Sequence, residues 1–163
     1  MIRNIWAPIF KVSLLMIFIS CSTRSECQTK TTGVKEGIRN MAYEIVRDLH
    51  NEGPISWLKY FSNSREFYMA SDGQLVFPNY DSADVFVRMF AKQMKQIDLT
   101  WNDIRIDSLS PDLGNMAASF HEILISTVGV QDTSAGYFTG VVENTSAGWK
   151  LRNAHWSIIH SKH

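Results

Sequence analysis

The spacing of apolar residues changes once along this chain, near Ile97, and this change limits the folds that it can adopt. Before Ile97, the apolar residues of two segments, 34–49 and 81–94, recur at the three- and four-residue intervals of amphipathic helices. After Ile97, apolar and polar residues alternate, as they do in strands with one buried face. Helices first and long sequential strands last predict an α+β domain whose sheet is mostly antiparallel.

Local sequence signals place the remaining elements. Pro54 suits the first turn of a short second helix, which carries Trp57 and Phe61. Residues 71–73, Ser-Asp-Gly, lie between two apolar runs and predict a small hairpin. The third helix is expected to begin at Asp81 or Ser82 and to turn five residues inward: Val85, Phe86, Met89, Phe90 and Met94. The four long strands are expected over residues 99–109, 116–128, 136–143 and 149–159.

The N-terminal segment has the pattern of an export signal. Arg3 and Lys11 precede an uncharged, mostly apolar run, residues 12–20, which is short of the about 20 residues that a bilayer span needs. Residues 1–20 are therefore interpreted as a signal peptide. Phe18-Ile19-Ser20-Cys21 resembles a bacterial lipobox, so Cys21 is expected to be acylated and to anchor the protein in the cell envelope, facing the periplasm or the outside. The alternative is ordinary cleavage nearby, with Cys21 incidental.

The residues after Cys21 are polar and separate this signal from the domain. Residues 21–32 are expected to form a flexible tether, and a single domain is expected over residues 33–163. Of the 16 basic residues two lie in the signal, which leaves 14 against 16 acidic residues. This balance gives no electrostatic attraction to nucleic acid. Because Cys21 and Cys27 both precede the domain, no disulfide is predicted within it.

Motifs in the last two strands carry a resemblance to a known family. Residues 136–140, Gly-Tyr-Phe-Thr-Gly, are followed by 148–151, Gly-Trp-Lys-Leu, and by 155–157, His-Trp-Ser. With the order of elements, these motifs resemble the nuclear transport factor 2-like superfamily, close to its SnoaL-like and ketosteroid-isomerase-like branch. The resemblance implies a cone-shaped fold, in which three N-terminal helices pack on a strongly curved sheet around an apolar cavity. A homodimer is also expected, formed through the broad face of the sheet. Tyr137 stands where many relatives have arginine, so anion binding is not expected there.

Candidate residues for this cavity come from strand parity and from aromatic content. Alternation along the last strand groups His155 and Ser157 with Asn153, Leu151 and Trp149, but parity does not say which face is concave. The candidates are Trp57, Phe61, Trp101, His121, Tyr137, Thr139, Trp149, His155 and Ser157.

Acid–base candidates are few. His155 could position or protonate a ligand, although a buried histidine that holds the sheet together through hydrogen bonds is the favoured interpretation. Asp103 and Glu143 could be general bases, yet each also fits a solvated strand face. His121 precedes Glu122, but adjacent strand residues point to opposite faces, so packing or surface exposure is expected there rather than a dyad.

Three functions remain open. The chain has no HExxH, CxxC, P-loop or GxSxG motif, so no metal, cofactor, nucleotide or acyl-enzyme chemistry is predicted. The favoured function is an exported, lipid-anchored domain that binds a small apolar or amphipathic molecule without chemistry. The alternatives are a homodimeric assembly or docking module of the envelope, and an isomerase- or cyclase-type enzyme using acid–base chemistry. An unmatched buried carboxylate in the cavity would favour the enzyme.

Acylation of Cys21 can be tested directly in a bacterial host. Metabolic labelling with a fatty acid should tag the wild type and should not tag Cys21→Ser, because the thiol is the acylated group. Equal labelling of both proteins, or a mature N-terminus elsewhere, would contradict the lipoprotein interpretation.

Overall fold

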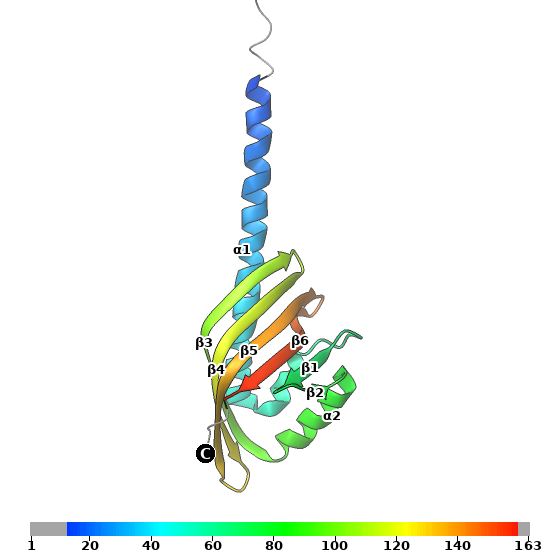
Figure 1. Cartoon of the computed structure of the whole chain (residues 1–163), viewed down its shortest axis with the longest axis vertical. Helices are drawn as coiled ribbons and strands as arrows, with labels where there is room; N and C mark the ends of the chain where they lie inside the picture. Colours follow the sequence, from blue (N-terminus) through cyan, green and yellow to red (C-terminus); the bar gives the residue numbers. More distant parts are fainter. Residues whose placement is uncertain (1–12, 160–163) are drawn as a thin grey trace, which may run out of the picture.

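The computed structural model describes residues 13–159, and side chains from residue 31 onward, as an α+β domain built on one curved sheet. Its elements in chain order are α1 (Ser13–Glu52), the 3-10 helix η1 (Pro54–Lys59), β1 (Tyr68–Ser71), β2 (Gln74–Phe77), α2 (Tyr80–Ala91), β3 (Met94–Ser110), β4 (Leu113–Ser126), β5 (Gln131–Thr145) and β6 (Gly148–Ile158). The six strands follow the order β2-β1-β6-β5-β4-β3 (Figure 1). Among the six strands described, only β1 and β6 pair in parallel, so the predicted, mostly antiparallel α+β class is confirmed.

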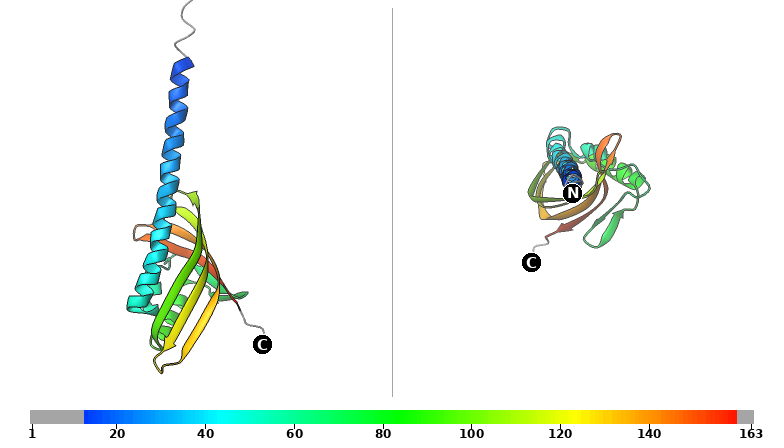
Figure 2. Two further views of the ribbon diagram at one scale, coloured as in Figure 1. Left: turned by 90° about the vertical axis from the view of Figure 1, so that its left-hand side faces the viewer. Right: turned by 90° about the horizontal axis from the view of Figure 1, so that it is seen from above.

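Helix α1 supplies much of the core on the inner face of the sheet. Its apolar stripe, predicted from the helical spacing of residues 34–49, is buried: Val34, Ile38, Met41, Ile45 and Leu49. Seen from above, the strands curve around this helix (Figure 2). Burial of these side chains removes apolar surface from water and is the main force holding helix to sheet.

The first helix begins at Ser13, well before the expected start near residue 34, and extends beyond the sheet (Figure 1). Residues 21–32, expected to be a flexible tether, are helical here, and residues 22–32 contain no proline or glycine to interrupt the helix. Within residues 13–159, no helix is long and apolar enough to cross a membrane. Arg3 and Lys11 lie outside the described residues, and cleavage and acylation at Cys21 stay predictions.

A buried carboxylate joins the end of α1 to η1. Asp48 accepts hydrogen bonds from Tyr60 Oη at 2.8 Å, Lys59 Nζ at 3.1 Å and Arg47 Nε at 2.9 Å. Burial by itself would raise the pKa of Asp48, but these three donors outweigh it and lower the pKa to about 2. The contact holds η1, and therefore Trp57, against the inner side of the domain.

The helices differ from the expected three-helix N-terminal layer. Only α1 and η1 precede the first strand, and α2 follows the β1–β2 hairpin. Asn79, rather than Asp81 or Ser82, caps α2, through a reciprocal capping box with Ser82. Val85 and Met89 are 68% and 53% exposed, so their predicted inward direction is wrong. Val87 is buried instead. Val85 and Met89 each lie two positions from Val87, which is about 200° around the helix, so they point to the opposite side.

A bulge reverses the expected parity of β6. Val141 pairs with Asn153 and Val142 with Leu151, which leaves Arg152 as an extra residue. Leu151, Ala154 and Trp156 therefore face inward, whereas His155 and Ser157 are exposed on the outer face. The prediction that His155 and Ser157 share a face with Leu151 and Trp149 is wrong for this reason.

Two glycines of α1 give a matched test of the contact between this helix and β6. A methyl group at Gly37 would overlap the indole of Trp149, whereas one at Gly33 would meet no atom within 4 Å. We expect Gly33→Ala to stabilise the domain by about 0.5–1 kcal/mol, the usual gain of alanine over glycine in a helix. Gly37→Ala should instead cost about 1–3 kcal/mol through overpacking, measured by urea unfolding. A gain in both variants would show that Trp149 does not pack on α1 as described.

Candidate functional site

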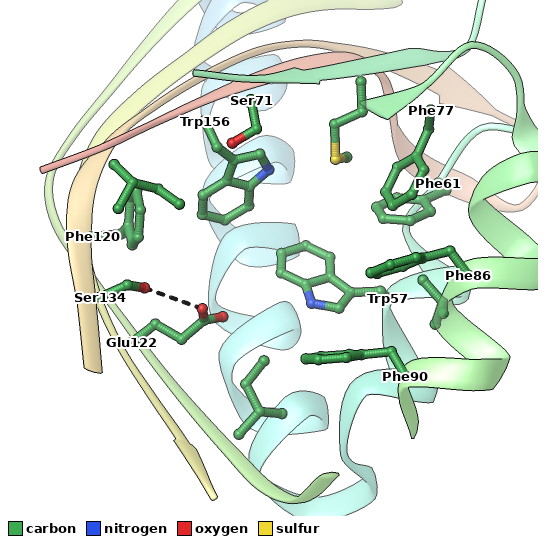
Figure 3. A pocket seen from close by; sticks show the side chains of 14 residues that line it. Trp57, Phe61, Ser71, Phe77, Phe86, Phe90, Phe120, Glu122, Ser134 and Trp156 are labelled. Atoms are coloured by element: carbon green, nitrogen blue, oxygen red, sulfur yellow. Dashed lines mark hydrogen bonds between the residues drawn. The ribbon is translucent and has the colours of Figure 1, made fainter. Parts of the chain in front are cut away.

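A cavity of about 320 Å³ lies between the inner face of the sheet, η1 and α2 (Figure 3). This volume is at the lower end of the range of small-molecule sites. The cavity is lined by Trp57, Phe61, Met69, Ser71, Phe77, Phe86, Val87, Phe90, Ile97, Phe120, Glu122, Ser134, Trp156 and Ile158.

Aromatic side chains make up half of the lining residues and hold one another in place. Trp57 stacks on Phe61 at 5.7 Å between ring centroids and meets the edge of Trp156 at 5.8 Å. Phe86 and Phe90, one turn apart on α2, stack at 5.8 Å on the other side. These offset and edge-to-face arrangements are the favoured geometries of aromatic pairs, so the wall is preformed.

Glu122 is the one acidic residue of the lining. Inward positions of β4 alternate, and Glu122 follows Phe120 on this face, with Leu99 of β3 and Ser134 of β5 as its cross-strand neighbours. Ser134 Oγ donates a long hydrogen bond of 3.4 Å to Glu122 Oε2 (Figure 3). Burial raises the pKa of Glu122 to about 6, Ser134 opposes this increase, and the negative charge of Asp132 adds to it. The carboxyl group is therefore poised to gain or lose a proton near neutral pH.

Glu122 is not among the site residues predicted from the sequence. It entered only as the neighbour of His121, and packing or surface exposure was expected at the pair. The two side chains do point to opposite faces, as predicted: His121 is exposed, and Glu122 lines the cavity. The available signal was parity, since Glu122 continues the row of Met116, Ala118 and Phe120 and is a lone acid among apolar residues.

Of the predicted cavity residues, Trp57 and Phe61 line the cavity. Trp101 lies behind it, stacked on Trp156 at 5.6 Å, and donates its indole N–H to the carbonyl oxygen of Ala42 at 3.2 Å. Trp149 packs beside Gly37 of α1. The other five predicted residues are exposed on the outer face of the sheet and do not line the cavity: His121, Tyr137, Thr139, His155 and Ser157.

The three acid–base candidates also lie away from the cavity. His155 pairs with Thr139 of β5, and its side chain is exposed on the outer face. It is therefore neither a buried structural histidine nor a residue that could contact a ligand in the cavity. Asp103 is exposed at an irregularity of β3, where its φ is 50°. Glu143 accepts a hydrogen bond from Ser62 and lies 3.8 Å from Arg152 at another surface depression. Among the described side chains, residues 31–159, no three His, Cys, Asp or Glu groups come together as metal ligands.

Comparison with known proteins identifies the fold. No family model and no curated protein matches the sequence. Among solved structures, a putative scytalone dehydratase from Novosphingobium aromaticivorans superposes with a TM-score of 0.68 at 15% identity, covering 83% of this chain and 92% of that one. A nuclear transport factor 2-like superfamily protein from Salmonella enterica superposes with a TM-score of 0.62 at 13% identity, over 84% and 96% of the two chains.

A third similar structure is a hexachlorocyclohexane dehydrochlorinase (LinA) type 2, with a TM-score of 0.60 at 9% identity over 81% of this chain and 93% of that one. At such identities the likeness concerns the fold and not the activity. The strand order, the helix enclosed by a curved sheet and these superpositions agree: the chain has the nuclear transport factor 2-like fold.

Proposed function

We propose that this domain is a receptor for a small, largely apolar molecule that carries one polar group. The observation that carries the proposal is the cavity itself, about 320 Å³ with a mainly apolar wall and a single carboxyl group at Glu122. Sites for small molecules are typically of this kind, with a mostly apolar wall and a few polar groups that fix orientation. The flat faces of Trp57 and Trp156 favour a ligand with a planar or cyclic body.

A second function, of the isomerase type, is favoured by Glu122 alone. A carboxyl group whose pKa is about 6 can accept a proton from a carbon acid at neutral pH more effectively than a fully solvated one. The hydroxyl group of Ser71 in the same cavity could donate a hydrogen bond to a developing oxyanion. This arrangement differs from the sequence-based candidates, because none of His155, Asp103 and Glu143 reaches the cavity.

The proposed setting is the cell envelope. It rests on the lipobox-like residues 18–21, which would leave the domain exported and attached to the membrane through the lipid on Cys21. A homodimer belongs to the same proposal. The outer face of the sheet offers exposed aromatic residues for such an interface, since Tyr68 is 46% and Tyr137 is 42% exposed.

The receptor can be tested with 2-tetralone, a neutral bicyclic ketone. We expect saturable binding to the wild type, followed by saturation-transfer NMR in heavy water. Ser71→Phe should abolish binding, because Ser71 lines the cavity and a phenyl group there would occupy part of it. Leu75→Phe is the matched control and should bind normally, since Leu75 belongs to the same hairpin but is 61% exposed and outside the lining.

The same samples separate binding from chemistry. A receptor without activity should leave the rate of deuterium incorporation next to the ketone carbonyl unchanged. Exchange that is accelerated by the wild type and lost in Glu122→Gln would establish the isomerase-type function instead. Binding that persists in Ser71→Phe would show that the ketone occupies another site.

A further inference from the structure

We infer that the cavity selects a lipophilic amine, bound as its ammonium ion, with the cationic nitrogen beside the Glu122 carboxylate and the apolar body among the aromatic rings. This inference rests on the proposed function, because it names the chemical class of the ligand for the same cavity. Glu122 is the one charged residue of the lining, and no other lining residue carries an opposite charge.

Among the side chains of residues 31–159, none supplies a cation to Glu122. None of the fourteen lining residues is Lys, Arg or His. The basic side chains of the two helices that close the cavity are engaged elsewhere: Lys59 of η1 pairs with Asp48 and Glu52, and Arg88 of α2 pairs with Asp84. Lys92 and Lys95, between α2 and Ile97, are exposed and outside the lining. On the sheet side, Glu122 has Leu99 and Ser134 as neighbours and feels the negative charge of Asp132. A partly buried carboxylate without a cationic partner is costly, and a cationic ligand would remove that cost.

The wall is also suited to a cation. Electron-rich ring faces attract ammonium groups, and tryptophan does so most strongly. Trp57 and Trp156 meet edge to face at 5.8 Å, and Phe120 meets Trp156 at 4.8 Å with an interplanar angle of 81°. The rings are therefore turned in different directions around the cavity. Glu122 and Ser134 project from the sheet, across the cavity from Phe86 and Phe90 of α2 (Figure 3). An ammonium group at Glu122 would thus have a carboxylate on one side and aromatic rings on the others.

Other ligand classes fit this arrangement less well. An anionic ligand would meet Glu122 and the nearby charge of Asp132, and like charges in a poorly solvated site repel strongly. A neutral ligand could bind among the rings, but it would leave the carboxylate with only the long hydrogen bond from Ser134. The amine alone uses both the charge and the aromatic wall.

Three probes with the same naphthalene body test the inference: 2-naphthylmethylamine, 2-naphthylmethanol and 2-naphthoate. By titration calorimetry near neutral pH we expect the amine to bind about tenfold or more tightly than the alcohol, and the carboxylate to bind most weakly. Glu122→Gln, which keeps the shape of the side chain, should reduce amine affinity to that of the alcohol. Asp132→Asn is the control: Asp132 is exposed and outside the lining, so the preference for the amine should persist.

A pH series on the wild type gives a readout that does not depend on any variant. Amine affinity should fall as the pH decreases through about 6, because protonation of Glu122 removes the charge that holds the ammonium. Alcohol affinity should stay nearly constant over the same range. Equal binding of amine and alcohol, a flat pH profile for the amine, or full amine affinity in Glu122→Gln would overturn the inference while leaving the receptor intact. Binding of none of the probes would overturn the receptor as well.

Discussion

The buried carboxylate of Asp48 fixes the relative positions of the two helical elements on which the site depends. It lies near the end of α1 and accepts hydrogen bonds from Lys59 and Tyr60, at the end of η1. Burial of this charge is offset by its donors, which lower its pKa to about 2, so the contact remains ionised at any physiological pH. Because η1 is held in this way, Trp57 faces the inner side of the sheet and closes the cavity on the side of η1.

Glu122 differs from Asp48 in how well its carboxylate is stabilised by the protein. Asp48 has three hydrogen-bond donors, whereas Glu122 has Ser134 at 3.4 Å and an apolar surrounding. The raised pKa of Glu122 means that its ionised form is less favourable in the folded protein than in water, so at neutral pH it lowers stability. Groups that reduce stability in a preformed cavity are characteristic of functional sites, which is why the proposed function centres on Glu122 and not on Asp48.

Much of the architecture could be predicted from the sequence because it depends on periodicity and local signals. The amphipathic stripe of residues 34–49, the hairpin at Asp72-Gly73 and the motifs of β5 and β6 led to the observed fold.

The inner face of the sheet could not be predicted in this way. Parity does not distinguish the concave face, and the extra residue at Arg152 reverses the alternation partway along β6. Because of that bulge, His155 and Ser157 lie on the outer face. On β4 the predicted residue His121 also lies outside, and its neighbour Glu122 lies on the inner face. The rotation of α2 was missed for a similar reason, since burial of Val87 depends on its packing against distant elements.

The pKa of Glu122 in the ligand-free protein tests the central claim most directly, because the claim is that this carboxyl group lies unpaired in an apolar cavity. It can be measured by following the carboxyl carbon signal of Glu122 through a pH titration by NMR, with Glu122→Gln to assign the signal. We expect a midpoint near 6, well above the ordinary value of 4.5. A midpoint at or below 4.5 would mean that Glu122 is well solvated or already paired with a cation, and would contradict the assignment of the site.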